Sequence, residues 1–208
     1  QPGHPTYLRS DLLAGRGVPH AFSTRQGGVS EPPFDTLNLG NPSGPNAPQD
    51  DDANMAENYD RLARAIGCGE RRRSWVYQVH GGDCVRAEPA NCGTKADALI
   101  GDDPGCLLSV RTADCVPILL ASADGRTVAT VHAGWPGLVA GVIGHAVAQF
   151  GMGMREMVAA IGPTISAAHF EVGEEVAMRF DPAHVIRRPD RKPHVDLPGI
   201  AAAQLAAA

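Results

Sequence analysis

Residues 54–67 carry a hydrophobic pattern that predicts a helix. The apolar and aromatic side chains of this stretch recur every three or four residues, the spacing that places them on one helical face: Met55, Tyr59, Leu62, Ala63 and Ile66. Gly67 follows directly, and glycine is a common end signal for a helix. We therefore expect a helix with one buried face.

Four short apolar runs predict strands at 74–79, 106–111, 116–122 and 127–133. They are rich in β-branched residues and are bounded by glycine, aspartate and proline, which is typical of strands that end in turns. The sequence Ser-Ala-Asp-Gly at 122–125 lies between the last two runs. We expect it to form a tight turn that makes residues 116–133 a hairpin.

The last third of the chain predicts three further elements. Residues 138–150 form an apolar stretch that we expect to be one buried helix despite its two glycines. Residues 157–163 predict a buried strand that ends in Gly-Pro, and 174–180 predict a short helix. Helices mixed with strands and a hairpin favour an α+β fold with a mixed sheet. Residues 41–52, rich in proline, glycine and acidic residues, predict a solvent loop.

Composition narrows the class of protein. The 208 residues fit one domain, so we expect a single domain over 1–208. The chain has 18 basic and 23 acidic residues, a net charge of −5, which argues against a nucleic-acid partner but leaves room for a local anion pocket.

No apolar run approaches the roughly 18 residues of a membrane span. The beginning of the sequence lacks the features of a signal peptide.

Cysteine usage points to a reducing compartment. The five cysteines are odd in number and include no CxxC pair. We therefore expect a cytoplasmic protein with reduced thiols and no membrane partner. The sequence does not determine the oligomeric state.

Three metal-ligating residue types lie at or near the ends of predicted strands: His80, Cys115 and His132. Strand ends present side chains at a common edge of a sheet. Two imidazoles and one thiolate suit a catalytic zinc, because they leave a fourth tetrahedral position open. Such a metal would hold Cys115 as thiolate and lower the pKa of a bound water. A buried apolar cysteine and two hydrogen-bonded structural histidines are the alternative, and spacing alone leaves both open.

Arg25 is a candidate anion ligand. It precedes Gly27 and Gly28, where the absence of a side chain lets the backbone approach a ligand closely. An arginine beside such a turn suits a phosphate or a carboxylate. A solvated arginine beside an ordinary turn is the alternative.

Charged residues also precede Cys115. Arg111 and Asp114 could act in the site, or they could form a salt bridge at a sheet edge. Glu171 is predicted to cap the short helix that follows it. His145, inside the apolar stretch 138–150, is expected to be structural.

With these segments placed, the chain resembles the laccase-domain family of YfiH-type proteins, formerly called multicopper polyphenol oxidases. The matching stretches run in family order through most of the chain. They are STRQGGVSEPPFDTLNLG (23–40), ENYDRLARAIG (57–67), WVYQVHG (75–81), ADALI (96–100), RTADCVPILL (111–120), VHAGWPGL (131–138), IGPTIS (161–166) and FEVGEEV (170–176). The combination of QVHG, TADC and HAGW is specific. The resemblance implies a single α+β domain with layered α/β/α architecture and a mixed sheet.

The resemblance also implies an activity and a set of site residues. It makes His80, Cys115 and His132 the ligands of a zinc ion and places them among the catalytic residues. For deamination by a zinc-bound hydroxide, we expect the nearby acid Asp114 to carry the proton. The expected substrates are a purine nucleoside (adenosine, inosine, guanosine or methylthioadenosine) and phosphate, with adenosine deamination as a further activity. Copper fits the donors too, but no second or third copper cluster is visible. Candidate substrate and phosphate ligands are Arg25, Arg111, Asn38 and Gln78.

Other activities remain open. One is a metal-free hydrolase, deamidase-like or editing peptidoglycan precursors, with Cys115 as nucleophile and His132 as base. The others are a copper-dependent phenol oxidase and a degenerate binder without catalysis. Pro136 stands where the family usually has an arginine. If that arginine holds an anionic substrate, we expect this protein to bind phosphate weakly or to use another substrate. The chain ends at AAAQLAAA where relatives continue, so we expect part of the site wall to be missing.

Overall fold

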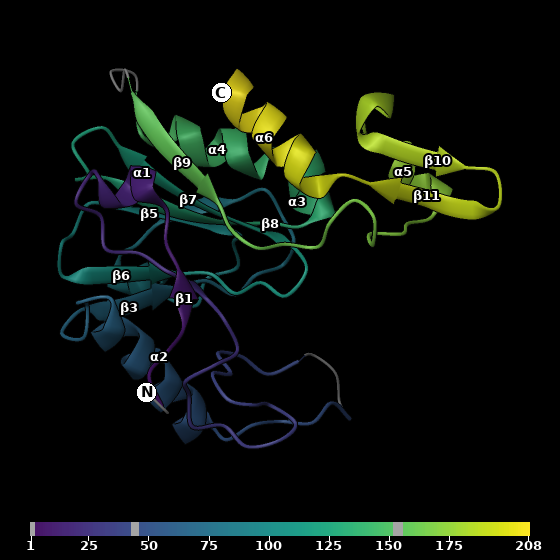
Figure 1. The fold of residues 1–208 in the computed structure, drawn as a ribbon. Helices are drawn as coiled ribbons and strands as arrows, with labels where there is room; N and C mark the ends of the chain where they lie inside the picture. The colour runs from purple at the N-terminus through teal and green to yellow at the C-terminus, as the bar shows by residue number, and fades with distance from the viewer. Residues whose placement is uncertain (1–2, 43–45, 152–155) are drawn as a thin grey trace. The chain divides into compact units, whose positions relative to one another are not determined.

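The computed structural model describes residues 3–42, 46–151 and 156–208 (Figure 1). Two compact units divide the chain, residues 1–72 and residues 73–208. The single domain expected over 1–208 stays a prediction. Part of the predicted solvent loop at 41–52 lies outside the described residues.

The first unit is built around one long helix. Helix α2 (Asp52–Ala65) confirms the predicted amphipathic helix, although it begins two residues earlier than expected. Gly67 follows it with a φ of +76°, a conformation that glycine adopts without strain. Strands β1 (Tyr7–Leu8) and β2 (Phe22–Ser23) pair antiparallel, and α1 (Asp11–Ala14) lies between them in sequence.

A polar network shapes the loops of the first unit. The carboxylate of Asp50 accepts hydrogen bonds from the side chains of Ser30, Asn38 and Asn54. Burial alone would raise the pKa of Asp50, but these hydrogen bonds outweigh burial and lower it. The fully buried Asn58 of α2 donates to Ser30, so helix and loops share one network.

The second unit contains a five-stranded mixed sheet. Its strands lie in the order β4 (Cys84–Arg86), β5 (Ala98–Gly101), β8 (Val128–Ala133), β7 (Val116–Ser122) and β9 (Met157–Ile161). β4 and β5 are parallel, and every other neighbouring pair is antiparallel. The β7–β8 pair confirms the predicted hairpin, and the mixed sheet confirms the predicted class, a mixed α/β fold.

Helices cover one face of this sheet. Helices α3 (Trp135–Val139), α4 (Val142–Ala148) and α6 (Leu197–Ala207) contact one another and the central strands (Figure 1). Ala98 and Ile100 of β5 are fully buried in the same core as these helices. Alternate side chains of a strand point to one face, so the helices pack on the face that Ala98 and Ile100 share.

The opposite face of the sheet supports a smaller core. Leu99, between Ala98 and Ile100, packs with Val76 and Cys106. Cys106 belongs to β6 (Cys106–Ser109), which pairs with β3 (Arg72–Trp75). The second helical layer of the expected α/β/α arrangement is not seen within residues 73–208 as described, and it stays a prediction.

The prediction of one continuous helix at 138–150 is wrong. Gly141 has a φ of +78°, which a continuing helix cannot accommodate, and it divides the stretch into α3 and α4. α3 also begins earlier than expected, at Trp135.

Two strand predictions need correction. β9 confirms a strand at 157–161, but it lies at the edge of the sheet and its residues are only half-buried. β3 ends at Trp75, short of the predicted limit at residue 79, and only an isolated bridge between Tyr77 and Lys95 continues the pairing.

The C-terminal part of the second unit adds a hairpin that the sequence pattern did not reveal. Strand β10 (Val185–Arg188) pairs antiparallel with β11 (Arg191–Val195) beside α5 (Glu174–Ala177), which confirms the predicted short helix in shorter form. Glu171 does not cap α5. Gly173 holds that position, and the Glu171 carboxylate instead lies 3.8 Å from Lys192 Nζ.

None of the described helices combines the length and the apolar character that crossing a membrane requires.

Candidate metal centre

Three side chains from distant parts of the sequence meet in the second unit. The potential ligand atoms of His80, Cys115 and His132 all lie within 4.8 Å of one another. The two imidazole rings meet edge to face, with centroids 4.8 Å apart and an interplanar angle of 79°. This group can hold a metal ion, as the sequence predicted.

The β7–β8 hairpin explains why two of these residues are neighbours. Val116 pairs with Ala133, and Pro117 pairs with His132. Cys115 directly precedes Val116, so it lies at the same end of the hairpin as His132. The turn chemistry at 122–125 therefore fixes this part of the site, because it sets the register of the two strands.

The three side chains differ in exposure. His132 is buried within β8, Cys115 is half-buried, and His80 is exposed. The cluster therefore opens to solvent on the side of His80. A ligand would approach from that side, while the opposite side is closed by the sheet.

Gly134 makes the close approach of two of these side chains possible. A Cβ at this position would lie 2.7 Å from His80 Cδ2 and 3.1 Å from Cys115 Sγ. No ordinary packing contact is that short for the ring carbon, so only glycine fits between them. This gives a physical reason for glycine in the HAGW stretch.

Asp97, the residue directly before β5, forms hydrogen bonds with two members of the cluster. This fully buried carboxylate accepts a 2.7 Å hydrogen bond from Nδ1 of His132 and a 2.9 Å bond from the backbone N–H of His80. Sequence reasoning did not single it out. One signal was available in the sequence ADALI, where the aspartate is followed immediately by an apolar run. A carboxylate beside a buried strand needs hydrogen-bond donors to offset the cost of its burial.

Electrostatics around His132 favour its protonated form when no metal is bound. Burial alone would lower the pKa of His132, but hydrogen bonds with Asp97 and Cys115 outweigh burial and raise it to about 9. Burial would likewise raise the pKa of Asp97, yet its hydrogen bonds with His132 and the backbone hold it below its usual value. The pair is thus a carboxylate that orients the ring of a protonated histidine.

Backbone contacts hold the loop that carries Cys115. The side-chain amide of Gln78 donates to the carbonyl of Arg111 at 2.6 Å and accepts from the N–H of Arg111 at 2.7 Å. The carbonyl of Asp114 accepts from the Thr164 hydroxyl at 2.7 Å and from the Ile165 N–H at 3.0 Å. Gln78 therefore ties the His80 and Cys115 loops together. Its substrate role, and those of Arg111 and Asp114, whose side chains are exposed, stay predictions.

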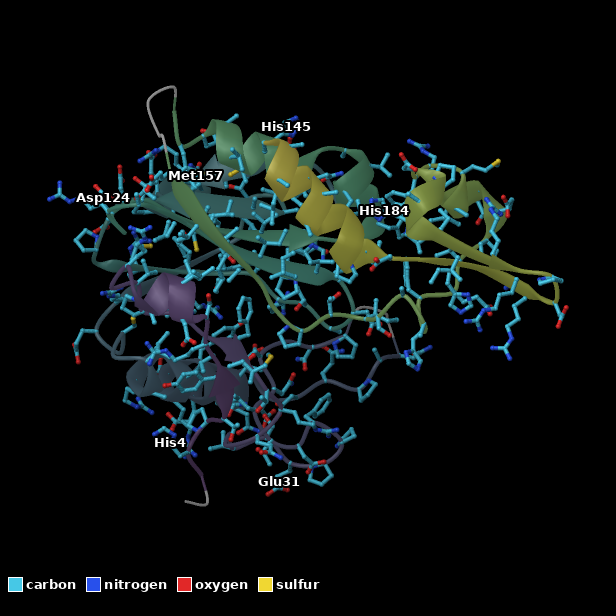
Figure 2. The ribbon with its side chains drawn as sticks, turned by 45° about the horizontal axis from the view of Figure 1, so that its top comes forward. His4, Glu31, Asp124, His145, Met157 and His184 are labelled. Atoms are coloured by element: carbon cyan, nitrogen blue, oxygen red, sulfur yellow. The ribbon has the colours of Figure 1, made fainter. Side chains whose placement is uncertain are left out.

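His145 anchors the loop after His80. It lies on α4 (Figure 2), and its Nδ1 donates to the carbonyl of Gly82 at 2.8 Å. This contact agrees with the structural role expected for His145, since it connects the helical layer to the segment that carries His80.

The other predicted anion ligands belong to the first unit. Arg25 is exposed, and its Nε donates to the carbonyl of Asp35 at 2.9 Å. The backbone carbonyl of Arg25 accepts from the N–H groups of Thr36 and Leu37. The side chain of Asn38 donates to Asp50 and accepts from the Gly40 N–H, so its amide is engaged inside the unit. Their binding roles stay predictions.

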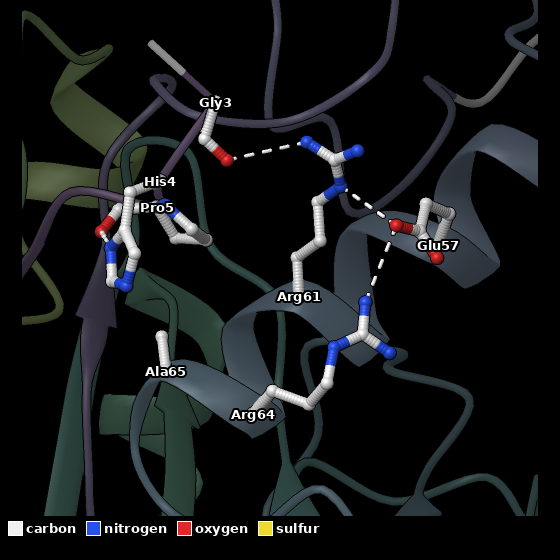
Figure 3. A pocket seen from close by; sticks show the side chains of 7 residues that line it. All are labelled: Gly3, His4, Pro5, Glu57, Arg61, Arg64 and Ala65. Atoms are coloured by element: carbon white, nitrogen blue, oxygen red, sulfur yellow. Dashed lines mark hydrogen bonds and ion pairs between the residues drawn. The ribbon is translucent and has the colours of Figure 1, made fainter. Parts of the chain in front are cut away.

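The first unit also contains an open cavity of about 510 Å³ (Figure 3). Its floor carries Arg61 and Arg64, whose guanidinium groups share Oε1 of Glu57 at 2.8 and 3.3 Å. Arg61 also donates to the carbonyl of Gly3 at 3.3 Å. None of the predicted site residues lines this cavity.

The fold and the site define a mixed α/β protein with a His/Cys/His cluster suited to a metal. Residues 19–208 match the family described as multi-copper polyphenol oxidoreductase laccase, and the chain belongs to this family.

Several relatives of this chain carry the name purine nucleoside phosphorylase. A Pseudomonas aeruginosa protein is 41% identical over 183 residues, 88% of this chain and 72% of that protein. The Escherichia coli protein YfiH is 41% identical over 167 residues, 79% of this chain and 66% of its own length.

Solved structures show the same fold. A Neisseria meningitidis protein of 30% sequence identity superposes with a TM-score of 0.81, covering 98% of this chain and 83% of that one. YlmD from Geobacillus stearothermophilus gives a TM-score of 0.78 at 27% identity, covering 90% of this chain and 75% of its own.

Pro136, which replaces the arginine expected from the family, fits its local structure. It lies at the start of α3, after Gly134 as N-cap. The first N–H groups of a helix have no partner within the helix, so proline costs nothing there.

Proposed function

We propose that this chain is a zinc-dependent purine nucleoside phosphorylase. The observation that carries the proposal is the convergence of His80, Cys115 and His132 on one point, in a chain whose relatives bear the name of that activity. The substrates would be phosphate and inosine, adenosine, guanosine or methylthioadenosine, with adenosine deamination as a further activity.

The donor set fits zinc. Imidazoles and thiolates are both zinc ligands, and three protein ligands leave one tetrahedral position for a further ligand. Because Nδ1 of His132 donates to Asp97, Nε2 is the nitrogen available to a metal. When bound, zinc would supply a Lewis acid at the solvent-open side of the cluster.

In phosphorolysis, a phosphate oxygen forms a bond to C1′ of the ribose. The bond from C1′ to the purine nitrogen breaks, its electron pair leaves with the base, and the base takes up a proton. The exposed guanidinium groups of Arg25 and Arg111 are the candidates for holding phosphate, since arginine binds its oxygens in a bidentate manner. Asp114, next to Cys115, is the candidate proton carrier.

The test is the phosphate-dependent release of hypoxanthine from inosine by the zinc-loaded protein. We expect release by the parent, none without phosphate, and a loss of at least about a hundredfold in Cys115→Ala, in line with the loss of a metal ligand. Cys92→Ala is the matched control, because Cys92 is exposed and lies outside the cluster. No release by a folded, zinc-loaded parent would contradict the proposal.

A second function is favoured by one specific contact. His132 interacts with both Cys115 and Asp97, which is the order of nucleophile, base and orienting acid found in cysteine hydrolases. In that case the thiolate of Cys115 would attack the carbonyl carbon of an amide without a metal. The C–N bond would break, His132 would protonate the leaving amine, and water would then hydrolyse the thioester and regenerate the thiol.

Metal content separates the two functions. About one zinc per chain after purification without chelators, together with phosphorolysis, supports the first. A metal-free chain in which iodoacetamide modifies Cys115 much faster than the exposed Cys92 supports the second, because an activated thiolate reacts faster.

A further inference from the structure

We infer that Asp97 is a positioning residue that sets both histidine ligands from one buried carboxylate. The inference rests on the proposed metal centre and goes beyond it, since Asp97 itself is not a metal ligand. Its two oxygens together bind the ring of one histidine and the backbone of the loop that carries the other.

Every oxygen of this carboxylate is used. Oδ1 accepts from Nδ1 of His132 at 2.7 Å and from the N–H of His80 at 2.9 Å. Oδ2 accepts from the N–H of Gly81 at 2.6 Å and from that of Val79 at 3.2 Å. Four donors converge on a side chain with no exposed surface, an arrangement that satisfies a buried charge.

The bond to His132 decides which nitrogen faces the cluster. A carboxylate can only accept here, so Nδ1 must carry a proton, and Nε2 is the nitrogen whose lone pair can bind a metal once its own proton is displaced. An asparagine at this position could present its NH₂ group to Nδ1 and stabilise the opposite tautomer, in which Nε2 carries a proton and cannot bind a metal.

The bonds to the backbone decide where His80 lies. His80 is a non-glycine residue with a φ of +59°, a region that L-residues seldom occupy. Val79 and His80 are both exposed, so apolar burial of their side chains does little to fix this turn. Three consecutive N–H groups directed at one carboxylate supply the missing constraint.

Asp97 is itself rigidly placed. Its carbonyl accepts from the N–H of His132 at 2.8 Å, and its N–H donates to the carbonyl of Asp83 at 3.0 Å. The carboxylate is thus anchored to the strand that carries one ligand, and it holds the loop that carries the other.

The experiment compares Asp97→Asn with Asp50→Asn. Asp50 is a matched control, because it is a buried carboxylate that also accepts several hydrogen bonds but lies in the other unit. We measure zinc affinity by chelator competition, the absorption spectrum of the cobalt-loaded protein, and thermal unfolding without metal. We expect zinc affinity to fall about 10- to 100-fold in Asp97→Asn, with an altered thiolate-to-cobalt band. Asp50→Asn should lower the unfolding temperature but leave affinity within about twofold.

Equal zinc affinity in Asp97→Asn and the parent would overturn the inference, as would an equal loss in Asp50→Asn. If Asp97→Asn does not fold, amide hydrogen exchange in the metal-free parent decides. The exposed loop should then show protected N–H groups at Val79, His80 and Gly81, and rapid exchange there would overturn the inference. A parent that binds no zinc refutes the proposed metal centre, whereas the exchange experiment still tests Asp97.

Discussion

At the scale of single residues, the absence of one side chain matters as much as the ligands. Gly134 has a φ of −73°, which alanine adopts without strain, so the constraint on this position is purely steric. Gly134→Ala should move His80 or Cys115 and weaken zinc affinity by about tenfold or more. The strain should also cost about 1–3 kcal/mol of stability. Chelator competition and urea unfolding measure the two effects, and an unchanged zinc affinity would contradict the prediction.

His132 makes the stability of the metal-free protein depend on pH. Its pKa in the folded chain is raised from 6.5 to about 9, so its protonated form stabilises the fold. That contribution is complete below about pH 6.5 and is lost as the pH rises through about 9. We expect the difference in unfolding free energy between the metal-free parent and His132→Gln to shrink between about pH 6 and about pH 10. A difference that stays constant or grows would contradict this assignment.

The same proton affects metal binding in the opposite direction. Zinc must displace the proton from His132, so its affinity should increase as the pH rises toward about 9. Chelator competition at a series of pH values, with an indicator dye to count released protons, measures the effect. An affinity that does not change with pH would show that no proton is displaced.

At the scale of elements, two glycines in one apolar stretch behave differently. Gly144 lies inside α4, and a Cβ there would meet no atom within 4 Å, whereas Gly141 has a φ of +78° and separates α3 from α4. Gly144→Ala should raise stability by about 0.5–1 kcal/mol through helix propensity. Gly141→Ala should lower it by about 1–2 kcal/mol, because alanine is strained in this conformation. Urea unfolding of both variants tests the pair, and equal effects would contradict it.

At the scale of the whole molecule, a metal would connect segments that are far apart in the chain. Residues 80, 115 and 132 lie on three separate segments of the second unit. A ligand that binds only the folded state adds about 2.7 kcal/mol of stability at a free concentration of 100 times its Kd. We expect zinc to raise the unfolding temperature of the parent but not of Cys115→Ala. An equal rise in both proteins would mean that zinc binds elsewhere.

The hydrophobic pattern determined the elements whose signals are local. The helix at α2, the strands β7 and β8, and the turn between them could all be predicted, because side-chain periodicity and turn residues act over a few neighbouring positions. The three candidate metal ligands could be proposed from the sequence for a related reason, since their chemical types and their places near strand ends are visible there.

Other features depended on partners that are distant in the chain. Whether β9 is buried or half-buried depends on its place at the edge of the sheet, and the identity of a strand's neighbours is not a local property. Asp97 could not be singled out, because its importance lies in four donors that come from residues 79–81 and 132. The sequence by itself determined which residues could bind a metal. Only the tertiary structure decided that they meet, because their contact depends on strand register and on one buried carboxylate that joins two segments.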